Sequence, residues 1–258
     1  MVVPLSPPLV VREGGLECRL HLVGGAVVPD QPTFVLVPGI GMSHRYLRRL
    51  AAALAPHGRV GVIDLPGFGA NSTPAHPLSV QTFGALIGRA LDVAGISSCV
   101  LLGHSMGAQF AVELALRRPA LVSHLLLVGP VVDPERRSAR HQALGLAADS
   151  LLESPSANGI VFTDYWRSGP RWYLATLPAM LGYPIEHRIR LVGQPVLVLR
   201  GSRDPIARAA WCRELAGRAH NGRFAEIEGQ PHVVQHSAAD QVAAEILAFL
   251  TAPVGRSA

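Results

Sequence analysis

Short apolar runs alternate along this chain with longer segments in which apolar residues recur at helical spacing. Continuous hydrophobic runs bounded by glycine or proline are typical of strands buried on both faces of a parallel sheet. Such runs lie at Thr33–Pro38, Arg59–Pro66, Ser98–Gly103, His124–Gly129 and Pro195–Gly201, with a weaker one at Arg223–Gly229. A further run, Leu16–Val23, follows a Gly14-Gly15 turn and is predicted to be the second arm of a hairpin.

Helical patterns fill most of the intervals between these runs. They lie at Ser43–Ala55, Leu78–Ala94, Met106–Arg118, Ala207–Arg218 and Ala238–Leu250. Alternation of strands and helices predicts an α/β fold with a mostly parallel, doubly wound sheet. In such sheets the functional site lies beyond the carboxyl ends of the strands.

One interval, 133–190, interrupts this alternation, because it is too long for a single crossover helix. It holds six of the fourteen Phe, Trp and Tyr residues of the chain. We expect a helical cap here, inserted after the sixth strand, with residues 1–132 and 191–258 forming the core domain. An aromatic-rich cap over the strand ends would line a substrate pocket, and the candidate residues are Phe162, Trp166, Trp172 and Tyr173. Alternatively, these aromatic residues only attach the insertion to the core.

Composition narrows the class of protein. Hydrophobic residues make up 49% of the chain and charged residues 16%, which excludes a disordered chain. All 23 basic residues are arginine and the net charge is +5, but the arginines are scattered, which favours a solvated basic surface over a nucleic-acid site. No run is long enough for a membrane-spanning helix, and the amino terminus lacks the pattern of a signal peptide.

Three cysteines, Cys18, Cys99 and Cys212, are widely spaced and include no CxxC pair, so neither disulfides nor a zinc site are indicated. We therefore expect a protein of the reducing cytoplasm, with a small molecule as its partner and no nucleic acid. The sequence does not indicate an oligomeric state.

The segment "GHSMG" places Ser105 between Gly103 and Gly107, where a predicted strand meets a predicted helix. A sharp strand-to-helix turn forces its central residue into a strained conformation, and flanking glycines avoid a clash with the neighbouring chain. This arrangement presents the serine hydroxyl at the helix amino terminus, as in the nucleophile elbow. Ser105 is therefore the candidate nucleophile, and a plain turn serine is the alternative.

A serine nucleophile needs a base, and the base needs an acid that orients it. Asp204 follows the strand at Pro195–Gly201, and His232 follows the last strand in "IEGQPH", so both fall at the edge where Ser105 lies. Their chain order, Ser, Asp, His, is that of the nucleophile-elbow hydrolases. Asp133 is the alternative acid, and His236 and His104 are the alternative bases. We favour Asp204 and His232, because the base should lie on a loop, and expect His104 to be a packing residue.

Two backbone N–H groups are needed to stabilise the oxyanion that develops during acyl transfer. Met106, directly after the candidate nucleophile, would supply one. The loop "VPGIGMS", in which Gly39 and Gly41 allow close approach, would supply the other from Ile40. Asp64, in "VIDLPGFGANS", is interpreted as a residue that caps a turn.

These segments, together with "LVPGIG", "VLVLRGSRDP" and "IEGQPH", resemble the α/β-hydrolase fold superfamily over nearly the whole chain. The resemblance implies Ser105, Asp204 and His232 as a catalytic triad, the Ile40 and Met106 amides as the oxyanion hole, and 133–190 as the cap. One departure is Pro38-Gly39, where many relatives carry His-Gly. The resemblance implies no metal or organic cofactor.

The leading hypothesis is a serine hydrolase that cleaves a carboxylic ester, lactone or thioester of an apolar small molecule through an acyl-enzyme on Ser105. One alternative is a hydrolase of carbon–carbon bonds in ring-cleavage products. Those relatives usually carry an aromatic residue after the base, whereas Val233 follows His232 here. Another alternative is a catalytically silent ligand-binding protein on the same scaffold.

Overall fold

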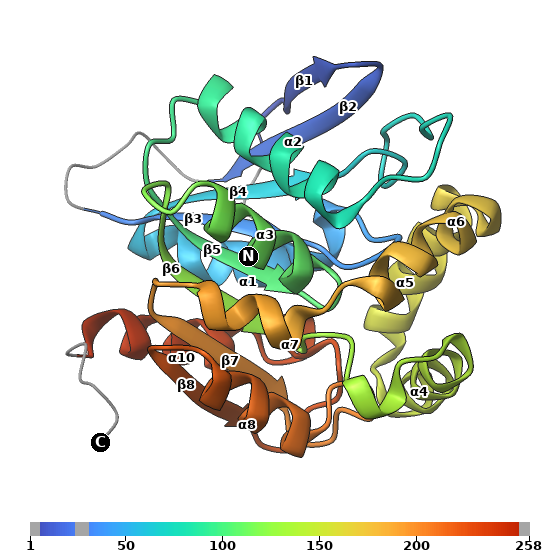
Figure 1. Ribbon diagram of the computed structural model, residues 1–258, viewed down its shortest axis with the longest axis vertical. Coiled ribbons are helices and arrows are strands. Elements are labelled where there is room, and N and C mark those ends of the chain that lie inside the picture. Colours follow the sequence, from blue (N-terminus) through green and yellow to red (C-terminus); the bar gives the residue numbers. More distant parts are fainter. Residues whose placement is uncertain (1–5, 24–30, 253–258) are drawn as a thin grey trace.

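The computed structural model describes residues 6–23 and 31–252. Residues 1–5, 24–30 and 253–258 of the predicted core domain lie outside the described residues. One sheet of eight strands runs through the molecule, in the order β1-β2-β4-β3-β5-β6-β7-β8 (Figure 1). Its strands are β1 (Leu9–Glu13), β2 (Leu16–Val23), β3 (Thr33–Val37), β4 (Arg59–Asp64), β5 (Cys99–His104), β6 (Val122–Val128), β7 (Val196–Gly201) and β8 (Gly222–Ile227).

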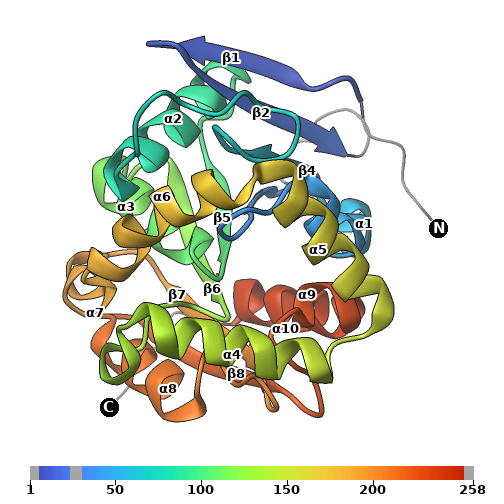
Figure 2. The ribbon, with the colours of Figure 1, turned by 90° about the vertical axis from the view of Figure 1, so that its right-hand side faces the viewer.

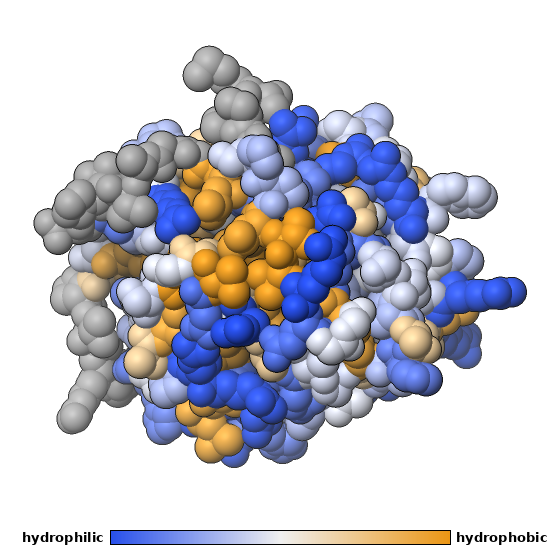
Figure 3. Space-filling view, turned by 90° about the horizontal axis from the view of Figure 1, so that it is seen from above, coloured by the Kyte–Doolittle hydropathy of each residue, from blue (hydrophilic) through white to orange (hydrophobic). Residues whose placement is uncertain are grey.

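The sheet is parallel from β4 through β8, and β1 and β2 form an antiparallel hairpin at one edge. This hairpin follows from Gly14 and Gly15, which both have positive φ and form its turn. The central strand β5 is buried along its whole length, as its uninterrupted apolar sequence predicts. Seen from the hairpin side, hydrophobic residues gather near the centre of the surface and hydrophilic ones border them (Figure 3).

Helices cover both faces of the sheet (Figure 1). On one face lie α2 (Val80–Val93), α3 (Gly107–Arg117) and α8 (Ala209–Arg218), and on the other lie α1 (Arg48–Leu54) and α10 (Ala239–Thr251). Short α9 (Val234–Ser237) precedes α10, and the short 3-10 turns are η1 (His44–Leu47), η2 (Ala55–His57), η3 (Pro134–Arg136) and η4 (Ile189–Leu191). Each face thus has its own hydrophobic core, and the sheet separates the two.

Between β6 and β7 the chain forms a run of helices instead of a single crossover. These are α4 (Ala139–Leu152), α5 (Pro155–Ser168), α6 (Pro170–Gly182) and α7 (Ile185–Arg188). Figure 2 looks onto α4 on one side and α5 and α6 on the other, with the ends of β5 and β6 between them. We refer to α4, α5 and α6 together as the cap helices. Within the described residues, no helix has the length and apolar character required to cross a bilayer.

Candidate active site

Ser105 lies in the turn between β5 and α3, with a φ of 54°. It is the one residue other than glycine with a positive φ in the described part of the chain. Its N–H donates to the carbonyl oxygen of Val128, at the end of the adjacent strand β6, at 2.9 Å. The left-handed conformation costs free energy for a residue with a side chain, and such strain is found at functional turns. The turn therefore has the geometry of a nucleophile elbow.

The glycines around Ser105 are required by close backbone approach. A Cβ on Gly103 would lie 2.2 Å from the carbonyl oxygen of Gly107, and one on Gly107 would lie 2.4 Å from that of Val37. The loop after β3 also passes close to the serine, because a Cβ on Gly39 would lie 3.0 Å from the Cβ of Ser105. The loop expected to supply an oxyanion donor is therefore adjacent to the serine.

Asp204 and His232 form a hydrogen-bonded pair. Oδ2 of Asp204 lies 2.7 Å from Nδ1 of His232, and both side chains are buried. The other carboxylate oxygen of Asp204 accepts the N–H groups of Ile206 at 2.7 Å and Ala207 at 2.9 Å. The loop after β7 thus fixes the carboxylate, and the carboxylate fixes which nitrogen of the imidazole carries its proton.

Two contacts place this pair beside the turn of Ser105. Nε2 of His104, the residue before the serine, lies 3.1 Å from the carbonyl oxygen of His232. A Cβ on Gly129, at the end of β6, would lie 2.9 Å from Cε1 of His232. The three residues expected to form the triad therefore lie on adjacent loops at the carboxyl ends of β5, β7 and β8.

The alternative residues have other partners. Asp133 is paired with Arg208, whose Nε lies 2.7 Å from Oδ2 of Asp133. Nε2 of His236 lies 3.1 Å from the hydroxyl of Ser156, and burial lowers the pKa of His236 to about 4. His104 is fully buried and burial holds its pKa well below the usual range, as suits a packing residue.

Two buried carboxylates, Asp149 of α4 and Glu153 directly after that helix, hold the backbone of the histidine loop. Oδ1 of Asp149 accepts the N–H of His232 at 2.9 Å, and Oε1 of Glu153 accepts the N–H of Val233 at 2.6 Å. Burial alone would lower the pKa of His232, but the charge and hydrogen bond of Asp204, with the charges of Asp149 and Glu153, outweigh it and raise that pKa to about 9. Burial raises the pKa of Glu153 to about 7.

The candidate oxyanion donors are two backbone N–H groups at the same place. Within the described residues, the N–H groups of Ile40 and Met106 donate to no other backbone or side-chain atom. Both side chains are buried in the hydrophobic core. Unpaired N–H groups beside a serine hydroxyl are able to stabilise negative charge.

A second cap helix, α5, holds the loop that carries Ile40. Asp164 is buried, and its Oδ2 accepts the N–H of Ser43 at 2.9 Å and the hydroxyl of Ser43 at 2.6 Å. The ring of Tyr165 packs against Gly41, where an added Cβ would lie 2.7 Å from it. Helices α4 and α5 thus each form hydrogen bonds to one of the loops that border Ser105.

The four aromatic residues expected at a pocket differ in position. Trp172 is buried and Tyr173 is partly buried, and the ring of Tyr173 packs edge-on against Tyr165 with centroids 5.0 Å apart. Phe162 and Trp166 lie on the outer surface of α5, 60% and 86% exposed. The inward-facing aromatic surface of the cap therefore comes from Tyr165, Trp172 and Tyr173.

One cluster of side chains has the composition of a metal site. His21, His44 and Asp64 offer ligand atoms within 4.8 Å of one another. Both imidazoles already hydrogen-bond Oδ2 of Asp64, at 2.9 Å and 2.8 Å, and their rings stack with centroids 3.8 Å apart. Although burial would raise the pKa of Asp64, its hydrogen bonds to His21 and His44 lower it to about 2. Because both imidazoles hydrogen-bond the same carboxylate oxygen, this is a hydrogen-bonded cluster joining β2, η1 and β4.

Comparison with known proteins agrees with this geometry. The family described as "alpha/beta hydrolase fold" matches residues 32–157. An enol-lactonase from Burkholderia xenovorans LB400 superimposes with a TM-score of 0.81 at 22% identity, over 95% of this chain and 100% of that one. The chain has the α/β-hydrolase fold. The predicted fold class is thereby confirmed.

Curated relatives support a hydrolase enzyme on this α/β-hydrolase fold. A poly(3-hydroxyalkanoate) depolymerase from Ectopseudomonas oleovorans is 27% identical over 95% of this chain and 94% of its own length. Polyketide synthase ThaQ of Burkholderia thailandensis is also 27% identical over 95% of this chain, but the match covers only 13% of that much longer protein. The depolymerase, matched over nearly its whole length, supports ester-hydrolase activity in general.

Sequence reasoning did not identify four residues that organise the candidate site. Asp149, Glu153 and Asp164 are acidic residues of the predicted cap, and the sequence does not tell which side of the cap faces the core. Arg200 is the fourth, a buried arginine inside β7. The sequence gives one signal for this residue, a charged side chain at the end of an otherwise apolar strand. Because a buried charge must have partners, such a position predicts ion pairs or hydrogen bonds.

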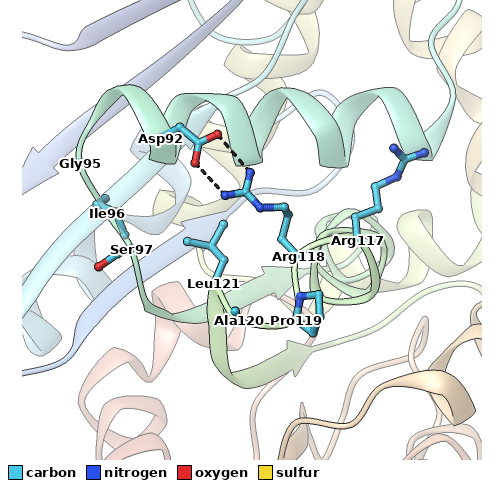
Figure 4. Close-up of a pocket in the computed structure, with 9 residues that line it drawn as sticks. All are labelled: Asp92, Gly95, Ile96, Ser97, Arg117, Arg118, Pro119, Ala120 and Leu121. Carbon is cyan, nitrogen blue, oxygen red and sulfur yellow. Dashed lines mark hydrogen bonds and ion pairs between the residues drawn. The ribbon is translucent and has the colours of Figure 1, made fainter.

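A separate hollow of about 570 Å³ lies at the opposite edge of the sheet (Figure 4). The loops that precede β5 and β6 line it, and Arg118 bridges it with two hydrogen bonds to Asp92. Since active sites of α/β folds lie at the carboxyl ends of the strands, this hollow at their amino ends is not part of the candidate site.

Proposed function

We propose that the protein is a serine hydrolase that cleaves a carboxylic ester, lactone or thioester of an apolar small molecule. The observation that carries the proposal is the strained turn of Ser105 beside the buried Asp204–His232 pair. A depolymerase of a poly(3-hydroxyalkanoate) and an enol-lactonase are among the proteins similar to this chain, and both names refer to ester substrates.

In the proposed reaction, the Ser105 hydroxyl attacks the carbonyl carbon while Nε2 of His232 accepts its proton. Asp204 holds the Nδ1–H of His232 and stabilises the imidazolium that forms. The N–H groups of Ile40 and Met106 donate to the oxyanion of the tetrahedral intermediate. His232 then donates its proton to the leaving oxygen or sulfur, and Ser105 is left acylated.

Hydrolysis of the acyl-enzyme repeats these steps with water. His232 accepts a proton from the water molecule as its oxygen attacks the acyl carbonyl, and returns the proton to Ser105 as the acid leaves. No step needs a metal or an organic cofactor. The cap, residues 133–190 in our proposal, would cover the acyl group with Tyr165, Trp172 and Tyr173, whose apolar rings favour an apolar substrate.

The experiment that tests this proposal combines covalent labelling with turnover. A fluorophosphonate probe should add one label to the wild-type protein, located on Ser105 by peptide mass, and none to Ser105→Ala. Hydrolysis of p-nitrophenyl esters of increasing acyl length should be lost in the same variant. A folded wild-type protein that neither takes up the probe nor hydrolyses any ester would reject the proposal.

A further inference from the structure

Helix α4 buries two polar side chains and exposes three of its four leucines. Gln142 and Asp149 are buried, whereas Leu144 is 59% exposed, Leu151 87% and Leu152 37%. The three leucines fall at i, i+7 and i+8, so they share one face of the helix. A surface helix of a globular protein normally shows the opposite arrangement.

The neighbouring helices extend this exposed apolar surface. On α5, Phe162 and Trp166 are four residues apart and 60% and 86% exposed, while Asp164 is buried. On α6, Leu174 is 61% exposed. Within the described chain, eight large apolar side chains are exposed, and six of them belong to α4, α5 and α6. Apolar exposure is therefore concentrated on the cap helices, and Figure 2 shows no other element in front of these helices.

Charge on the same helices has one sign at the surface. Residues 139–182, all of them described, contain three acidic residues, and Asp149, Glu153 and Asp164 are all buried against the core. The arginines of this segment point to solvent; they are Arg140, Arg167 and Arg171. The outer surface of the cap helices therefore carries leucine, phenylalanine, tryptophan and arginine without an exposed carboxylate. We call it the cap surface.

We propose that the cap surface adsorbs to a lipid surface with anionic head groups. Leucine, phenylalanine and tryptophan with basic residues are the composition of helices that lie in a membrane interface. Arginine gains additional attraction from anionic lipids. Trp166 and Leu151 project almost free of neighbours, and a fluid hydrocarbon phase can surround such side chains without a preformed pocket. A second copy of the chain would instead bring like charges together.

Adsorption in this orientation would place the candidate active site against the lipid. The cap helices lie over the carboxyl ends of the strands, where Ser105 is found (Figure 2). The inference concerns binding alone, and it holds or fails whether or not the proposed hydrolase activity is found.

Vesicle flotation tests this proposal. The wild-type protein is mixed with vesicles of phosphatidylcholine and phosphatidylglycerol in equal parts, and with vesicles of phosphatidylcholine alone, at low and high salt. We expect flotation with the anionic vesicles, less with the neutral ones, and a decrease at high salt because salt screens the arginines. In the double variant Leu151→Ser, Trp166→Ser, the partition coefficient onto the anionic vesicles should fall at least about tenfold.

The matched control is Leu191→Ser, which removes a leucine 65% exposed outside the cap helices and should bind as the wild type does. Arg167→Gln with Arg171→Gln should reduce binding to anionic vesicles only, and circular dichroism verifies that each variant is folded. Absence of wild-type binding would overturn the proposal, as would equal loss in the control. A different outcome would assign the surface to a second copy of the chain. In that case the wild type binds no vesicles but sediments as a dimer, and the Leu151 and Trp166 substitutions convert the dimer to a monomer.

Discussion

The carboxylate of Asp149 accepts the backbone N–H of His232 at 2.9 Å, across the boundary between cap helix α4 and the core. Glu153, the residue directly after α4, accepts the N–H of Val233. Because both carboxylates are buried, they act on the imidazole of His232 with little screening by solvent. The cap thus positions the loop of the proposed base and also contributes to its electrostatic environment.

Asp149→Asn should lower the pKa of His232. That pKa is about 9 because the charges of Asp204, Asp149 and Glu153 raise it by more than burial lowers it, so part of the rise comes from Asp149. Since only the neutral imidazole can accept the serine proton, kcat/KM of the wild type should rise with pH until about 9, and the rise should occur at lower pH in the variant. A pH profile of kcat/KM measures this.

The control for this prediction is Asp240→Asn, because Asp240 is an exposed carboxylate of α10. Its pH profile should match that of the wild type. An unchanged profile in folded Asp149→Asn would show that the carboxylate does not act on the imidazole.

Stability should fall as the pH rises from about 6.5 to about 9, whereas below pH 6.5 the lowered pKa values of His104 and His236 oppose the effect of Glu153. Burial raises the pKa of Glu153 from 4.5 to about 7, so ionisation in this interval destabilises the folded state. The pKa of His232 is raised from 6.5 to about 9, so its contribution is complete below pH 6.5 and is lost as the pH rises through 9. For His232 this contribution is on the order of 3 kcal/mol at most.

Glu153→Gln separates the two effects. The free energy of unfolding is measured by denaturant at a series of pH values. The value for the wild type minus that for this variant should decrease between pH 4.5 and 7, and both proteins should show the decrease above pH 6.5. The same slope in wild type and variant below pH 6.5 would contradict the assignment to Glu153.

Asp204 and Asp133 should differ sharply in their effect on turnover. Asp204→Asn removes the carboxylate that fixes the His232 tautomer, and kcat should fall on the order of 10⁴-fold. Asp133→Asn should reduce kcat by less than about tenfold, because Asp133 is paired with Arg208 and not with His232. Steady-state kinetics of the two purified variants measures the difference. An equal loss of kcat in the two variants would contradict the assignment of Asp204 as the acid that orients His232.

The sheet and the loops of the site could be predicted because their causes are local. Buried strands need uninterrupted apolar runs, and the turn of Ser105 needs glycine at 103 and 107, where the neighbouring backbone leaves no room for a Cβ. Chain order and strand ends then bring Asp204 and His232 to the same edge. The hydrogen bond between them agrees with that prediction.

The orientation of the cap helices could not be predicted, because it depends on tertiary contacts. Leucines of a surface helix normally face the core, yet three leucines of α4 are exposed, while Asp149 and Glu153, the residue after the helix, face inward and accept N–H groups of the histidine loop. Aromatic content likewise predicts Trp166 at a pocket, whereas it lies on the outer surface. Periodicity identifies a face of a helix but does not identify its neighbour.

Arg200→Lys should lower kcat and leave KM nearly unchanged. Arg200 is buried at the end of β7, where its Nε donates to the carbonyl oxygen of Ala207 at 2.7 Å and an Nη donates to that of Asp204 at 2.9 Å. It also pairs with Glu226 on β8. Lysine keeps the charge but lacks the planar fork, so the Asp204 loop loses part of its support and the imidazole loses its fixed orientation.

Arg200→Met should also destabilise the fold by about 3 kcal/mol, because it leaves Glu226 and the two carbonyl oxygens without their donor. Exposed Arg203, three residues further along, gives the matched control, and Arg203→Met should change neither kcat nor stability. Denaturant unfolding and steady-state kinetics on the three variants measure both effects. Since Arg200 acts through Asp204, combining Arg200→Lys with Asp204→Asn should cost little more than Asp204→Asn alone. Additive losses would show that Arg200 contributes to turnover independently of Asp204.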